Sequence, residues 1–180
     1  MSNDVFFPYA FEAPIEKFGV GKTRVIWYNV LMVPDEVCAE LPLDEYPRLR
    51  IEGEIAEVPI ANALMPTGDG RRYVIVSPTV LKEAEVRLGD HVEMRFRIAD
   101  QDHVDVPAGL SAALRNDRNA AAMWEALTPG KKRMLSQHVL SAKTEPTQAK
   151  RIGEALDALL NHGADLRALR YARKKRKPEA

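Results

Sequence analysis

The stretch from residue 48 to residue 98 constrains this chain most, because it holds two alternating strands separated by a glycine-rich turn. Near its start, Leu49, Ile51 and Ile55 recur on one side of an extended chain while charged residues fill the other side. The last run alternates with the same period, and its apolar members, which we expect to face a core, are Val92, Met94, Phe96 and Ile98. Strands that are apolar on one face must bury it, against another layer or by closing into a barrel.

Other segments predict more strands and one sharp bend. The run 23–33 is β-branched and aromatic without glycine or proline, which is typical of a strand buried on both faces. Residues 73–76 have the same character, and residues 5–11 predict an edge strand. The apolar phase shifts by one residue after Ile55, so we predict a bulge or a tight bend near Ala56 and Glu57.

A weak internal repeat suggests how these strands combine. A buried strand, a helix started by proline and an alternating strand occur once from about residue 30 and again from residue 73. Two such units fit a closed barrel of six to seven strands with pseudo-twofold symmetry, and closure also removes exposed sheet edges.

The pattern becomes helical after Pro107, which predicts an α+β protein in two parts. Apolar residues at helical spacing predict helices over the ranges 108–115, 118–127, 131–143 and 148–160, followed by a further turn at 165–171. We therefore predict a β-barrel domain at residues 1–106 and a helical module at 107–172. Residues 173–180 begin with a run of five basic side chains, and we expect this tail to be disordered.

The charge is unevenly distributed along the 180 residues, although the formal net charge is zero. Residues 1–107 carry 11 Lys and Arg against 19 Asp and Glu, whereas residues 108–180 carry 15 against 7. Either the two parts attract each other or a neighbouring copy, or the basic part meets a polyanion. With one cysteine, Cys38, and neither an export signal nor a membrane span in the sequence, we expect a cytoplasmic protein.

Few residues suggest catalysis or metal binding. The acidic run with Asp100, Asp102, His103 and Asp105 is the best metal candidate, but a solvated loop explains it better, since it lacks the spacing of a calcium loop. His138 lies on an apolar helical face, where a core or interface role is the more frequent one. We find no nucleotide-binding glycine motif and no nucleophile elbow, so we expect no catalytic residue, metal or cofactor.

Two groups of residues are candidates for binding. Glycines expose backbone N–H groups and arginines hold anions, so the first group is Gly68, Asp69, Gly70, Arg71 and Arg72, with Trp27 and Tyr73 able to line a nearby pocket. The second group would contact a nucleic acid or another anion and comprises Lys131, Lys132, Arg133, Lys150, Arg151, Arg173, Lys174, Lys175, Arg176 and Lys177.

The order of several motifs resembles a two-part bacterial arrangement. The front half is similar to the family known as domain of unknown function 1905, through Trp27 with Val33-Pro34, the strand 48–53, the turn 66–70 and the step Gly89-Asp90. The rear half resembles the YdeI/OmpD-associated or bacteriocin-protection family, through its helix starts and basic residues between 127 and 152. This chain has Glu57 where the front family often has glycine, and Gln148 and Lys150 where the rear family tends to have arginine.

The resemblance implies a double-split barrel related to the AbrB type with a helical appendage, a stress or defence association, and no known catalytic residues. Our first hypothesis is a non-enzymatic binding protein that recognises an anionic ligand, a nucleic acid or a protein partner, which could be a second copy of the chain. The alternative is a small-molecule-binding barrel or enzyme with a pocket near Trp27, Tyr73 and the turn 66–70.

Overall fold

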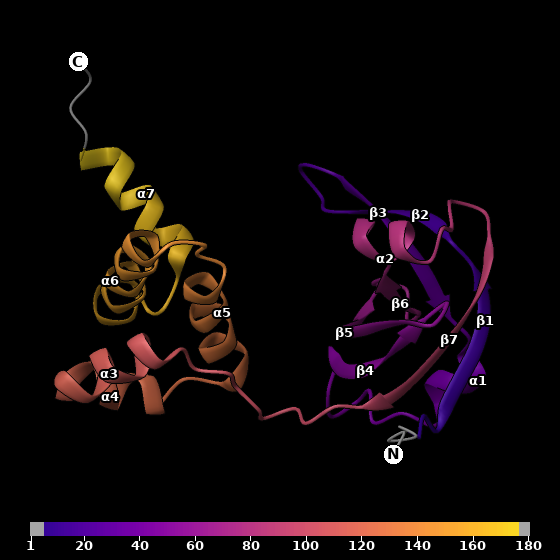
Figure 1. Ribbon diagram of the computed structural model, residues 1–180, viewed down its shortest axis with the longest axis horizontal. Helices are drawn as coiled ribbons and strands as arrows, with labels where there is room; N and C mark the ends of the chain where they lie inside the picture. The colour runs from indigo at the N-terminus through magenta and orange to yellow at the C-terminus, as the bar shows by residue number, and fades with distance from the viewer. Residues whose placement is uncertain (1–5, 177–180) are drawn as a thin grey trace. The chain divides into compact units, whose positions relative to one another are not determined.

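The computed structural model describes residues 6–176, which form two compact units that divide between Gln101 and Asp102 (Figure 1). The first, called the β unit, is built on a seven-stranded antiparallel sheet, and the second, called the helical unit, is built from helices. The strands are β1 Tyr9–Pro14, β2 Glu16–Val20, β3 Ile26–Val33, β4 Leu49–Ile55, β5 Val58–Pro66, β6 Arg72–Ile75 and β7 His91–Ile98. Helices α1 Asp35–Ala39 and α2 Pro78–Glu83 lie at opposite ends of the curled sheet.

The sheet curls on itself without closing. Its strand order is β1-β7-β4-β5-β6-β3-β2, so the two edge strands are consecutive in the chain and only Ile15 separates them. At this corner the Ile15 N–H donates to Asp90 O and the Gly89 N–H donates to Ile15 O, both at 2.9 Å. The α+β class is confirmed, but a closed barrel is not, because no ladder joins β1 to β2 in the described part of the chain.

The predicted bend at Ala56 and Glu57 is a tight hairpin that ends β4 and starts β5. Ile55 pairs directly with Val58, and the two residues between them have φ of 47° and 65°. Positive φ at both central positions is what a two-residue hairpin turn requires, and glycine or asparagine usually supplies it. The shift in apolar phase therefore marks the change from one strand to the next, and Glu57 occupies a position that favours glycine.

The predicted burial holds for most strand positions and is wrong at two strand ends. Residues 30–33 of β3 pair with β6, but Ile26 and Trp27 extend past β6 and are flanked by β2 alone, which leaves Trp27 64% exposed. Ile98, which we expected to face the core, is 36% exposed at the last position of β7. Burial on both faces thus applies to the second half of β3 only.

Aromatic packing fills the interior of the β unit. Phe96 is fully buried, stacks on Tyr9 with ring centroids 5.2 Å apart and meets Phe11 edge-on at 6.5 Å. Gly53 lies opposite Phe96 in the β4–β7 register, and β7 passes so close that no side chain fits there. An added Cβ at Gly53 would lie 2.1 Å from Arg95 O and 2.7 Å from Phe96 Cα.

The helical unit is organised around its longest helix, α6, which packs against α3, α4, α5 and α7. The bounds are α3 Ala108–Asn116, α4 Arg118–Glu125, α5 Pro129–Leu140, α6 Glu145–Asn161 and α7 Leu166–Arg176. Thr128 and Thr144 each cap the helix that follows, with proline in its first turn. The disordered tail that we predicted from residue 173 is wrong for residues 173–176, because α7 continues through them; residues 177–180 lie outside the described residues.

Candidate functional site

Asp69 organises the glycine turn before β6 and pairs with the Arg71 side chain. Thr67 Oγ1 and the Arg71 N–H both donate to Asp69 Oδ1, while Arg71 Nε and Nη2 donate to Asp69 Oδ2 at 3.1 and 2.9 Å. The hydrogen bonds from the Arg71 side chain, from Thr67 and from the Arg71 backbone hold the pKa of Asp69 well below its usual range. The predicted anion-binding arginine is therefore already paired with a carboxylate inside its own turn.

The other residues of the first predicted group lie in different environments. Tyr73 is 3% exposed and packs on Phe18, and burial raises the pKa of its hydroxyl. Trp27 is largely exposed, whereas the Arg72 guanidinium reaches the carbonyl oxygens of Arg71 at 3.2 Å and Gly70 at 3.4 Å. An inward tyrosine and an outward tryptophan do not line one cavity.

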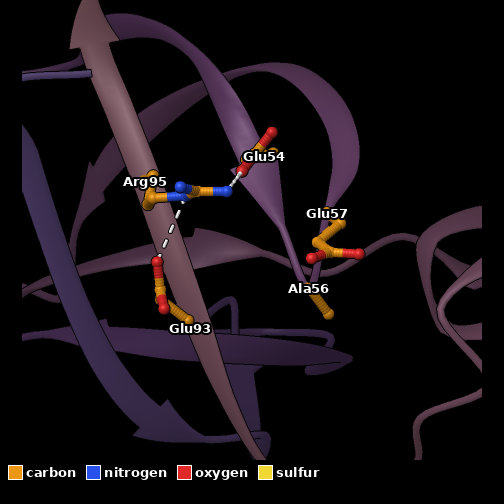
Figure 2. A pocket seen from close by; sticks show the side chains of 5 residues that line it. All are labelled: Glu54, Ala56, Glu57, Glu93 and Arg95. Atoms are coloured by element: carbon orange, nitrogen blue, oxygen red, sulfur yellow. Dashed lines mark ion pairs between the residues drawn. The ribbon is translucent and has the colours of Figure 1, made fainter. Parts of the chain in front are cut away.

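The β unit holds an acidic pocket of about 360 Å³ at the β4–β5 hairpin, which sequence reasoning missed (Figure 2). Its lining residues are Glu54, Ala56, Glu57, Glu93 and Arg95. Arg95 lies between two carboxylates and pairs with Glu54 and, at 3.2 Å, with Glu93. With three carboxylates to one guanidinium, the pocket repels anions, and within residues 6–176 no group of three side chains is arranged to hold a metal ion.

The basic side chains of α5 and α6 mostly serve the packing of the helical unit. Lys131 Nζ reaches Gly163 O at 3.4 Å, Lys132 pairs with Glu125 at 3.3 Å, and Arg133 donates to His103 O. Arg151 reaches His138 O at 3.0 Å. These four predicted contact residues thus have partners within the unit.

Arg173 lies on the inner face of α7 and fastens that helix to α6. Its Nη1 reaches Glu154 Oε1 at 2.9 Å, and its Nη2 reaches Asp157 at 3.4 Å. His138 of α5 contacts the other oxygen of Glu154 at 2.8 Å, so one carboxylate joins three helices. Burial alone would raise the pKa of Glu154, but the hydrogen bond and charge of His138, with Arg173 and Lys150, hold that pKa below its ordinary value.

We expect Glu154→Gln to lower the free energy of unfolding of the helical unit by about 1–2 kcal/mol at neutral pH, because it removes the charge that Arg173 and His138 share. Since the folded-state pKa lies below 4.5, this stabilisation is present above pH 4.5 and is lost as the pH falls through the folded-state pKa. Urea unfolding followed by circular dichroism at several pH values measures both effects. Glu125→Gln is the control, and an equal loss from it would contradict this role of Glu154.

The side of α7 that faces away from α6 carries cations and one aromatic ring. We call it the α7 outer face, and its residues, all exposed, are Arg167, Arg170, Tyr171, Lys174 and Lys175. Lys175 Nζ lies 4.9 Å from the Tyr171 ring centroid. In the described part of the chain no carboxylate pairs with the side chains of Arg167, Arg170 or Lys174. Lys177 and the side chain of Arg176 lie outside the described residues.

Two family models match this chain, one for each unit. Residues 11–96 match the model described as Domain of unknown function (DUF1905), and residues 103–162 match the one described as Bacteriocin-protection, YdeI or OmpD-Associated. The first segment of the chain is therefore similar to DUF1905, and the second is similar to the YdeI/OmpD-associated family. Searches of the curated proteins and of the solved structures each found no match.

The matches confirm the two-part resemblance and place the candidate sites relative to it. The glycine turn and the acidic pocket lie inside the DUF1905 match, whereas the α7 outer face follows the end of the YdeI/OmpD-associated match at residue 162. Helix α7 thus lies outside both matched segments. No helix in residues 6–176 is long and apolar enough to cross a membrane.

Proposed function

We propose that this chain is a non-enzymatic, cytoplasmic nucleic-acid-binding protein that contacts phosphates through the α7 outer face without reading base sequence. The observation that carries the proposal is the segregation of charge on α7. Its inner-face arginine, Arg173, is neutralised by two carboxylates of α6, while the cations of the outer face are exposed to solvent. Charges held on a helix surface without internal partners are available to an external polyanion.

The dimensions of the outer face suit a phosphate backbone. Arg167, Arg170 and Lys174 follow each other at helical spacing along one side, over roughly 10 Å of helix axis. A DNA duplex carries about one negative charge per 1.7 Å of its axis, so several phosphates lie within that length. Tyr171, which is 63% exposed between these cations, offers a ring to an unpaired base.

Reversing two of these charges tests the proposal. We expect Arg170→Glu with Lys174→Glu to weaken binding to mixed-sequence DNA and RNA at least about tenfold at low salt, because two phosphate contacts become repulsive. The dependence of log affinity on log salt should also become shallower by roughly 2 for duplex DNA. Fluorescence anisotropy with labelled oligonucleotides, at about 50 and 200 mM salt, measures both quantities.

The matched control changes the same charge elsewhere on the helical unit. Arg118 and Lys143 are also exposed, so Arg118→Glu with Lys143→Glu alters the net charge equally while leaving α7 intact. Equal losses from the two double variants would show that net charge alone matters, and this would contradict a site on α7. Binding to anionic lipid vesicles but to no nucleic acid would also contradict the proposal.

A further inference from the structure

The tip of the β2–β3 hairpin exposes apolar and basic side chains together. Val25 and Ile26 are each about half exposed and Trp27 is 64% exposed, although all three are large and apolar. Lys22 and Arg24 are exposed beside them, and in the described residues neither pairs with a carboxylate. Surfaces that bind single-stranded nucleic acid combine cations with exposed aromatic rings in this way.

Two glycines shape this tip, and one of them leaves room for the tryptophan ring. Gly19 pairs with Trp27 across the strands, and a Cβ at Gly19 would lie 3.3 Å from two ring atoms and 2.7 Å from Val25 Cγ1. The indole therefore packs into the space that glycine leaves, while its outer side remains open. Gly21 has a φ of 121°, and a Cβ there would meet Arg24 O at 2.2 Å, so the turn is tight as well.

We infer that this hairpin tip binds single-stranded nucleic acid, with an unpaired base stacked on Trp27 and its phosphates held by Lys22 and Arg24. A ring that is fixed on one side and open on the other loses little conformational freedom when a base stacks on it. The flanking cations favour an anionic ligand, and three apolar side chains on a two-stranded tip present too small an area for a stable protein interface. The inference takes its ligand class from the proposed function but uses a separate surface in the β unit.

Two substitutions test the Trp27 ring: the first removes it and the second crowds it. Trp27→Ala should weaken binding of a mixed-sequence single strand roughly 5- to 100-fold and leave duplex binding almost unchanged, since paired bases cannot stack on the ring. Gly19→Ala should give a smaller loss of the same kind, because the new methyl group clashes with Val25 Cγ1 at 2.7 Å and crowds the intact ring at 3.3 Å. Trp27→Phe should restore most of the affinity.

The full chain also provides a direct signal, because Trp27 is exposed and the second tryptophan, Trp124, is buried. We expect a single strand to quench the emission of the wild-type protein and of Arg170→Glu with Lys174→Glu at saturating concentration. Leu88→Ala removes a half-exposed apolar side chain elsewhere in the β unit and should change neither affinity nor quenching. Circular dichroism of each variant checks that the sheet remains folded.

The outcomes separate this inference from the proposed function. The hairpin site would be overturned if Trp27→Ala bound a single strand as tightly as wild type, or if the emission were not quenched at saturation. Neither result would contradict the proposed role of the α7 outer face. If the α7 double variant binds as tightly as wild type, the proposed function is contradicted. If a single strand still quenches the emission of that variant, the hairpin site is supported. Equal losses of single-strand and duplex binding in Trp27→Ala would also overturn base stacking.

Discussion

Replacing Gly53 by alanine is expected to destabilise the β unit by about 3 kcal/mol, because the added methyl group has no space between β4 and β7. Its Cβ would lie 2.1 Å from Arg95 O and 2.7 Å from Phe96 Cα, and both of these are backbone atoms that cannot move aside alone. The strands would have to separate where Phe96 packs on Tyr9 and Phe11. Stacking and ladder hydrogen bonds would weaken together.

Urea unfolding of wild type and Gly53→Ala, followed by hydrogen exchange of the backbone amides of β4 and β7, measures this loss. Gly153→Ala is the matched control, because nothing lies within 4 Å of a Cβ at that position of α6. It should stabilise the helical unit by about 1 kcal/mol, since alanine is the better helix former. If Gly53→Ala unfolds at the same urea concentration as wild type, the close approach of the two strands is wrong.

Truncating Trp124 should have the largest effect in the helical unit, a loss of about 3–5 kcal/mol. Trp124 is buried in α4, and its ring also lies 5.9 Å from Lys132 Nζ. It packs in one cluster with Leu110, Leu135 and Leu159, so its removal opens a cavity among four helices. A domain of about 80 residues has only about 4–12 kcal/mol of stability in total, so Trp124→Ala brings this unit close to unfolding.

Circular dichroism during thermal unfolding detects this loss, because the helical signal comes largely from this unit. Leu140→Ala removes an apolar side chain from the same unit, but Leu140 is half exposed and the variant should melt within a few degrees of wild type. An equal change in melting temperature for both variants would show that Trp124 is not a core residue.

Local sequence patterns predicted most of the secondary structure, but they did not predict which strands pair or that the sheet stays open. Ser77 accepts a hydrogen bond from the Val80 N–H at the start of α2, as a serine followed by proline indicates. The register that pairs β1 with β7 depends on contacts between residues 77 to 87 positions apart, and no local pattern encodes it. The open edge between β1 and β2 and the exposure of Trp27 follow from that long-range arrangement.

The candidate sites divide in the same way. Glu54 pairs with Arg95 because the two residues lie opposite each other in the β4–β7 register. They are 41 positions apart in the sequence, so no local pattern predicts the acidic pocket. The helical continuation through residue 176 had a visible signal, since Leu166, Leu169 and Arg173 follow at helical spacing. The run of basic residues obscured it, because such runs are commonly disordered.

The pairing of the first strand with the last one affects how the β unit can form during synthesis. Residues 9–14 leave the ribosome early but pair with residues 91–96, so at about 5–20 residues per second β1 waits roughly 4–16 seconds for its partner. During that time Phe11 and Ala13, which are buried in the finished sheet, have no β7 to cover them. In the helical unit α3 waits only for α6, which begins 29 positions after α3 ends, so that delay is shorter. We therefore expect the nascent β unit to need a chaperone more than the helical unit does.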